Sequence, residues 1–206
     1  MGARYYTRRE LMADASIKYI ELESCIFPKG VVAILDIIGN SNQWTYEGAV
    51  ARHDGTMGSN SSFHRLISIA KTGQLNRNTI RVAFSGASAT TLQLGGYTYT
   101  TFTISSDADY KLNFSCSANS ATLNGETKTT STSAGTASTY RLMIGSGYNS
   151  YGVSAISVKF WYFKAWQNGV LKGDYVPVMR REDGKLGILN KVNGTFITPS
   201  GGNITT

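Results

Sequence analysis

Apolar and polar residues alternate in short segments along most of this sequence, and that two-residue period restricts the chain to a β-rich fold. Turn-forming Gly, Asn and Ser residues separate the segments, and none has the length and 3.6-residue period of a long helix. The pattern therefore predicts a sandwich or barrel. The expected strands are 17–22, 31–38, 44–51, 62–70, 79–85, 97–105, 110–117, 121–123, 139–145 and 153–166.

The last of these segments is apolar on both faces. Its aromatic residues have both parities, Phe160, Tyr162 and Trp166 with one and Trp161 and Phe163 with the other. A strand of this kind lies between two layers or beneath a covering loop.

Turn signals are clear at two Asn-Gly pairs, 124–125 and 168–169, which favour tight hairpins. Residues 127–138 are almost all Thr, Ser, Ala and Gly, a composition that predicts a loop.

Residues 1–16 differ from the rest and are expected to form a short arm or helix ahead of a sandwich at 17–206. Thr7 can cap a short helix, because an acidic residue follows it three positions on. A frayed terminus is the alternative. The functional interpretation is an assembly arm that docks on a neighbouring subunit through Tyr5, Tyr6, Arg8, Arg9, Leu11 and Met12.

The chain of 206 residues has a formal net charge of +7. This charge suits either an anionic partner or simple solubility. The basic residues are spread along the sequence, which favours solubility, and no nucleic-acid partner is predicted. No apolar run is long enough to cross a membrane, and no apolar stretch follows the basic start as a secretory signal requires. Release inside an assembled particle would be another route out of a cell.

Cofactor signals are missing from the sequence. Cys25 and Cys116 lack CxxC spacing and are read as two buried thiols, with one disulfide as the alternative. Neither a P-loop nor a dinucleotide fingerprint occurs, so no cofactor is expected. Calcium uses scattered oxygen ligands, and Asp54 and the pair Asp107 and Asp109 are the suggestive positions.

Residues 159–196 read KFWYFKAWQNGVLKGDYVPVMRREDGKLGILNKVNGTF. This stretch resembles the end of concanavalin A-like, laminin G-like modules found in proteins of gut bacteria and their tailed phages. The resemblance implies a two-sheet antiparallel jelly-roll sandwich. It also implies structural roles at the turns, with Asp174 accepting backbone N–H groups ahead of a strand that contains Pro177. Two residues depart from the usual pattern, Gln167 and Gly173, and both are expected near the surface.

The same fold includes glucanases, whose two glutamates and an aspartate lie on one strand with the spacing E-x-D-x-x-E. The acids considered for that role are Glu21, Glu23, Asp36 and Glu47, and none has this spacing. A triad built on His53 or His64 lacks the Gly-x-Ser-x-Gly motif of a nucleophile elbow. The protein is therefore predicted not to be an enzyme.

Glycan binding needs exposed aromatic rings beside planar polar groups. Two tyrosines lie in a loop at 145–152 whose Tyr, Ser, Gly and Asn content is typical of recognition loops. The alternative for the two aromatic residues near position 45 is a place in the core. The candidate ligand-binding residues are Tyr148, Tyr151, Trp44, Tyr46, His53 and Arg65.

The leading hypothesis is a non-catalytic phage virion structural protein, namely a capsid decoration, head-fibre or tail-appendage subunit with a lectin-like sandwich. Its partners would be its own copies, as a homo-oligomer, or other virion proteins. The alternative is a free-standing carbohydrate-binding module for bacterial or host glycans, outside the cell or at its surface. A glucanase-like glycosidase is the third hypothesis.

Overall fold

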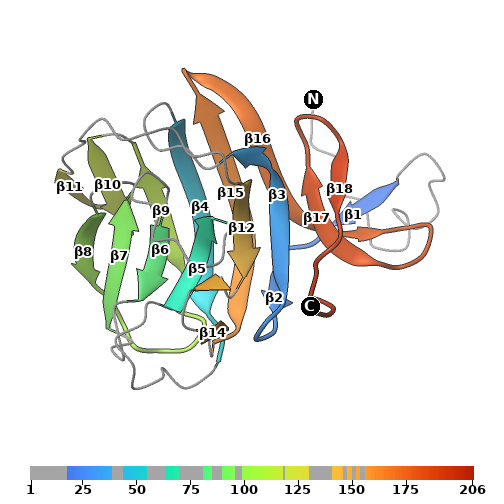
Figure 1. The fold of residues 1–206 in the computed structure, drawn as a ribbon, viewed down its shortest axis with the longest axis horizontal. Helices are drawn as coiled ribbons and strands as arrows, with labels where there is room; N and C mark the ends of the chain where they lie inside the picture. The colour runs from blue at the N-terminus through green and yellow to red at the C-terminus, as the bar shows by residue number, and fades with distance from the viewer. Residues whose placement is uncertain are drawn as a thin grey trace, which may run out of the picture.

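The protein is an all-β antiparallel sandwich of the jelly-roll type, as the sequence predicts, in which two large sheets pack face to face (Figure 1). Every regular element of the described residues is a strand, and these residues include no helix. The computed structural model describes residues 18–38, 44–54, 64–69, 81–84, 90–95, 99–117, 119–129, 141–145, 148–149, 152–153 and 156–206.

The larger sheet has the strand order β11-β10-β9-β4-β15-β16-β17-β18, with β1 beside β16 and β2 beside β15. Two long strands, β15 and β16, form its centre. The bounds are β1 Tyr19–Glu21, β2 Cys25–Phe27, β4 Trp44–Arg52, β9 Leu112–Cys116, β10 Ser120–Leu123, β11 Glu126–Thr129, β15 Val158–Gln167, β16 Val170–Arg180, β17 Leu186–Asn190 and β18 Thr195–Ile197.

The smaller sheet has the order β3-β12-β5-β6-β7-β8. A separate hairpin pairs Tyr148–Asn149 (β13) with Gly152–Val153 (β14). The bounds in the smaller sheet are β3 Val32–Ile38, β5 His64–Ile69, β6 Arg81–Phe84, β7 Thr91–Gly95, β8 Tyr99–Thr103 and β12 Arg141–Gly145.

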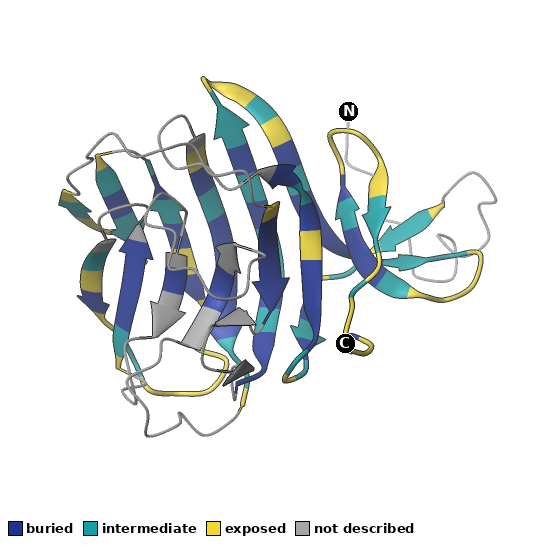
Figure 2. Ribbon diagram, viewed as in Figure 1, coloured by how far each residue is buried: buried dark blue, intermediate teal, exposed yellow. Residues whose placement is uncertain are grey.

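The core lies between the two sheets, and buried residues alternate with more exposed ones along the strands (Figure 2). Three rings on neighbouring strands form its centre, because Phe163 stacks on Tyr46 at 5.6 Å and on Tyr175 at 6.1 Å between centroids. Cys25 and Cys116 are free and buried, as expected from their spacing. Burial raises the pKa of the Cys116 thiol to about 12, so it stays protonated.

Each range in which the sequence predicts a strand contains one, and both Asn-Gly pairs turn as predicted. Asn124 and Asn168 have positive φ angles of 47° and 49°, each followed by a glycine with positive φ, as a two-residue hairpin turn of type I′ requires. The loop predicted at 127–138 is wrong at its start, because residues 126–129 pair with β10 as β11. The strands β2 and β7 were not expected at all.

The neighbour of β15 changes midway along the strand. Residues 158–160 pair with β2, whereas residues 163–167 pair with β16. The larger sheet therefore forks at residues 161–162. The chain crosses this fork between β1 and β2, where the backbone N–H of Leu22 donates to the Pro177 carbonyl at 2.9 Å.

Candidate ligand-binding groove

A β-bulge in β15 turns two adjacent aromatic side chains to the outer face of the larger sheet, the face that points away from the smaller sheet. Phe160 lies opposite Val50 of β4, but Tyr162 lies opposite Ala49, so Trp161 is an extra residue in the register. A bulge of this kind breaks the strict alternation of a strand. Phe160 and Phe163 consequently point into the core, and Trp161 and Tyr162 both point outward.

The outer face of β4 leaves room for these rings. Its outward residues beside them are Ala49 and Ala51, between inward neighbours such as Val50. Both alanines are 0% exposed although they lie on an outer face. Larger neighbouring side chains therefore cover both alanines.

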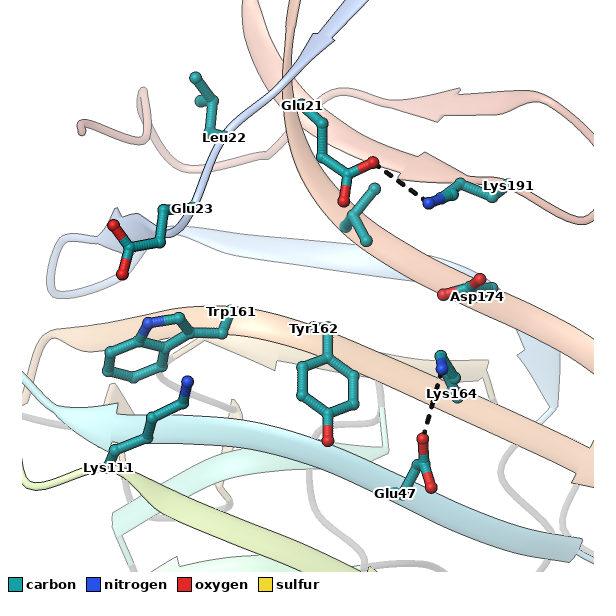
Figure 3. Close-up of a pocket in the computed structure, with 11 residues that line it drawn as sticks. Glu21, Leu22, Glu23, Glu47, Lys111, Trp161, Tyr162, Lys164, Asp174 and Lys191 are labelled. Atoms are coloured by element: carbon teal, nitrogen blue, oxygen red, sulfur yellow. Dashed lines mark hydrogen bonds and ion pairs between the residues drawn. The ribbon is translucent and has the colours of Figure 1, made fainter. Parts of the chain in front are cut away.

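A groove of about 470 Å³ lies over the fork, and the crossing segment forms one of its walls (Figure 3). Trp161 and Tyr162 form its aromatic side. Glu21, at the end of β1, and Leu22 and Glu23, in the segment that follows it, face them. The charged lining residues are the acids Glu21, Glu23, Glu47 and Asp174 and the lysines Lys111, Lys164 and Lys191.

Two of the four carboxylates are engaged with lysines. Lys164 Nζ is 3.5 Å from Glu47 Oε1, and Lys191 Nζ is 3.1 Å from Glu21 Oε2. The carboxylates of Glu23 and Asp174 have no ion-pair or hydrogen-bond partner among the residues that the structure describes. These two groups are therefore available to a ligand.

Tyr162 offers a neutral hydroxyl to the groove. Partial burial raises its pKa, and the nearby Glu47 carboxylate adds to this effect. A neutral phenol can both donate and accept a hydrogen bond.

The ammonium groups of two lysines lie over the Trp161 ring. Lys111 Nζ lies 4.9 Å and Lys159 Nζ 5.4 Å from the ring centroid. Lys159 is also 3.3 Å from Asp109 Oδ2, and Asp109 Oδ1 is 2.9 Å from His53 Nδ1. The indole is thus fixed by cation–π contacts on one side of the groove.

None of the six candidate ligand-binding residues from the sequence lines this groove. Tyr46 is 1% exposed, and burial raises its pKa, so it belongs to the core and its ring cannot meet a ligand. His53, with a side chain 33% exposed, lies beyond the groove in its pair with Asp109.

The other four candidates are only partly described. Trp44 starts β4 opposite Gln167, and Arg65 lies in β5 opposite Ala83, but their side chains lie outside the description. Tyr148 pairs with Val153 in the small hairpin. Tyr151 lies outside the described residues.

The proposed arm at residues 1–16 also lies outside the described residues, including Tyr5, Tyr6, Arg8, Arg9, Leu11 and Met12. Its role in assembly, and with it the virion hypothesis, stays a prediction. Light scattering on the full chain and on a chain that lacks residues 1–16 would test it. An oligomer that dissociates on truncation is the expected result, and a monomer in both cases would contradict it.

Three of the acids considered for catalysis, Glu21, Glu23 and Glu47, meet at the groove together with Asp174.

Asp174 lies in the middle of β16, so the expected turn ahead of a strand is wrong there. The departure at Gly173 is also not a surface position, because a Cβ there would meet the Tyr175 ring at 2.3 Å. The strand with aromatic residues of both parities does line the groove, but its pattern predicted only a place between two layers or beneath a covering loop.

Metal ligands do not gather among the described residues, where no group of three or more His, Cys, Asp or Glu side chains could hold an ion. Asp54 Oδ1 accepts a hydrogen bond from the Ser157 hydroxyl, and Asp107 Oδ2 accepts one from Ser105. In the same described part of the chain, no helix is long and apolar enough to cross a membrane.

No known family model matches this sequence, and no curated protein matches it.

Proposed function

We propose that this protein is a non-catalytic, lectin-like carbohydrate-binding domain, and that the groove over the fork of the larger sheet is its binding site. The observation that carries the proposal is the pair of adjacent aromatic residues, Trp161 and Tyr162, which the bulge in β15 turns out of the core. They lie beside two carboxylates without partners in the described part of the chain, Glu23 and Asp174.

This combination suits a sugar ring. The C–H face of a sugar is apolar and packs on an aromatic ring, while its edge is lined by hydroxyl groups. Carboxylates accept hydrogen bonds from hydroxyl groups, and such charge-assisted bonds are shorter and stronger than neutral ones. An aromatic wall with a few polar groups placed to orient the ligand is typical of small-molecule sites.

The arrangement of the acids supports binding over glycoside hydrolysis. A glycosidase needs two carboxyl groups that flank one glycosidic bond at a short, fixed separation. Glu21 and Glu47 are engaged with lysines. Glu23 and Asp174 lie at opposite ends of the groove in Figure 3.

Replacing the Trp161 side chain tests the proposal. In a glycan array, we expect binding to neutral glycans that Trp161→Ala weakens more than tenfold, because the stacking surface is removed. Trp166→Ala is the matched control, since Trp166 is a half-buried tryptophan of the same strand that does not line the groove.

Two outcomes would contradict the proposal. Equal loss of binding in the two tryptophan variants would place the site outside the groove. Release of reducing sugar from a bound polysaccharide, abolished by changing Glu23 or Asp174 to the amide, would make the protein a glycosidase.

A further inference from the structure

We propose that the groove takes an internal stretch of an extended, uncharged polysaccharide, which continues from the groove across the outer face of β9, β10 and β11. This inference rests on the proposed function and names the class of its ligand. The observations that carry it are the chemistry of these three strands, their register with the groove, and the direction in which their charged side chains turn.

The outer face of the three strands is made of hydroxyl and amide side chains. The inward residues, such as Phe114 and Leu123, are buried in the core. The residues between them point outward and are partly or fully exposed. They are Asn113, Ser115, Ser120, Thr122, Thr127 and Thr129, and none is charged.

The strand register joins this surface to the groove. Ser115 of β9 lies opposite Glu47, which lies opposite Lys164 in the groove. On the other side of Ser115 the row continues through β10 to the sheet edge. Across the larger sheet the row reads Thr127, Thr122, Ser115, Glu47, Lys164 and Asp174.

The two charged residues of β11 turn away from this surface. Lys128 Nζ donates to the Thr101 carbonyl of β8 at 2.8 Å and lies 4.7 Å from the Phe102 ring centroid. Glu126 Oε1 forms an ion pair with the same Lys128 Nζ at 3.1 Å. Both charges therefore lie at the side of the sandwich, and the outer face of β11 is left with its threonines.

This surface has the size of several sugar units. Neighbouring strands lie about 4.8 Å apart, so the four steps from β15 to β11 span about 19 Å, several times the width of one sugar ring. Single hydroxyl contacts are weak, and only a ligand that makes many of them in a row gains from such a surface.

The hydroxyl groups on this face can accommodate a ligand. Thr122 Oγ1 and Thr127 Oγ1 are 2.9 Å apart, and Ser117 Oγ and Ser120 Oγ are 3.0 Å apart. A hydroxyl has one donor and two acceptor positions, so each member of a pair keeps capacity for a further bond. An uncharged chain rich in hydroxyl groups is complementary to this surface, whereas a sulfated or uronate chain would bring its charge beside Glu23 and Asp174.

The experiment compares ligand length and charge by titration calorimetry. The probes are mixed-linkage β-glucan, xylan, galactomannan and starch, their fragments of three and six sugar units, and alginate as an anionic polymer. Salt of about 0.5 M screens the attraction of the basic protein for alginate. We expect at least one neutral polymer to bind, its six-unit fragment to bind at least tenfold more tightly than its three-unit fragment, and alginate not to bind.

If the polysaccharide crosses this surface, Thr122→Arg should remove the gain in affinity of the longer fragment. The reason is that the Thr122 side chain lies in the middle of the row. In this variant the three-unit fragment should bind as in the parent, and the tenfold gain of the six-unit fragment should vanish. Thr103→Arg is the matched control, on an exposed position of β8 in the smaller sheet.

The outcomes separate this inference from the proposed function. If the six-unit fragment gains nothing, if Thr122→Arg keeps the gain, or if only alginate binds, the extended neutral ligand is wrong and the groove can still bind sugar. If Trp161→Ala binds the fragments as the parent does, or if no probe binds, both proposals are overturned.

Discussion

Two carboxylate sites lie on opposite faces of strands β16 and β17, and they are built in opposite ways. On the side of the smaller sheet, the Asp36 carboxylate of β3 accepts hydrogen bonds from the Tyr175 hydroxyl and the Asn193 amide at 2.5 and 2.7 Å. The Asn190 amide donates to both of its oxygens. On the groove side, Asp174 has no such donor among the described residues.

The two sites share the same short stretches of chain. Asp174 and Tyr175 are neighbours in β16, and alternation sends one into the groove and the other towards Asp36. At the end of β17, Asn190 contacts Asp36, while the next residue, Lys191, forms its ion pair with Glu21 beside the groove.

The contrast between the two sites separates a carboxylate that stabilises the fold from carboxylates that are available to bind a ligand. Partial burial alone would raise the pKa of Asp36, but the hydrogen bonds from Tyr175, Asn193 and Asn190 outweigh it and hold the pKa below its usual value. That carboxylate joins β3 to the β16–β17 hairpin, and its hydrogen-bonding capacity is used within the fold. In the groove, the carboxylates of Glu23 and Asp174 keep their hydrogen-bonding capacity for a ligand.

Removing the satisfied carboxylate should have the largest effect. Asp36→Ala leaves the amide of Asn190, which is 0% exposed, and the Tyr175 hydroxyl without their acceptor. We expect the free energy of unfolding to fall by about 3 kcal/mol, measured by urea denaturation.

Glu21→Ala is the matched control, because it removes an exposed ion pair on the other face of the same strands. Its effect should stay within about 0.5 kcal/mol. Similar losses in the two variants would mean that the contrast between the two faces has no energetic basis.

Changing the groove carboxylates should affect binding and leave stability unchanged. In the double variant Glu23→Gln and Asp174→Asn the shape of the groove is kept, but the ligand loses charged acceptors. We expect binding of the neutral glycan found in the array to weaken about tenfold, which corresponds to about 1.4 kcal/mol. The melting temperature should stay the same.

Glu126→Gln is the control for this variant, since it removes an acidic charge of β11 that lies outside the groove. Unchanged binding in the double variant would show that the carboxylates take no part in recognition. A large loss of stability would show that they already have a structural role.

The architecture could be predicted because its signals are local. The strand at Trp44–Arg52 follows from alternation, and the turns at Asn124 and Asn168 follow from the ease with which Asn-Gly adopts positive φ. Such preferences depend on a few adjacent residues and survive in any sandwich.

The groove could not be predicted because it depends on contacts between distant segments. Strict alternation places Trp161 and Tyr162 on opposite faces, and only the register against β4 reveals the bulge that puts them together. Glu23 reaches the same groove because the chain crosses from β1 to β2 at the fork. No pattern in the sequence marks that change of neighbour.

Tyr46 shows the reverse case. The sequence left two interpretations open for this residue, a ligand-binding aromatic side chain or a place in the core. Its parity with Val50, however, places it on the inner face, where it stacks on Phe163. Parity within a strand was informative in β4, and the bulge at Trp161 made it misleading in β15.

The pH dependence of stability gives the finest test of the contrast. The Asp36 pKa is lowered in the folded state, so the unfolded chain takes up a proton on this residue first as pH falls. The stability that Asp36 contributes is therefore fully present above the ordinary aspartate pKa of about 3.9 and is lost as pH falls through the lower folded-state value.

Asp36→Asn removes this titration and keeps the size of the side chain. The difference in unfolding free energy between the parent and this variant should be constant above about pH 5 and should shrink as pH falls below about 4. The other acids titrate in both proteins, so their contributions cancel in the difference. Asp183 is one of them, and the hydrogen bond from Arg180 lowers its pKa to about 2. Urea denaturation from pH 7 to pH 2.5 measures it. A difference that does not change with pH would mean that Asp36 ionises alike in the folded and unfolded chains, and that its hydrogen bonds do not favour the charged carboxylate.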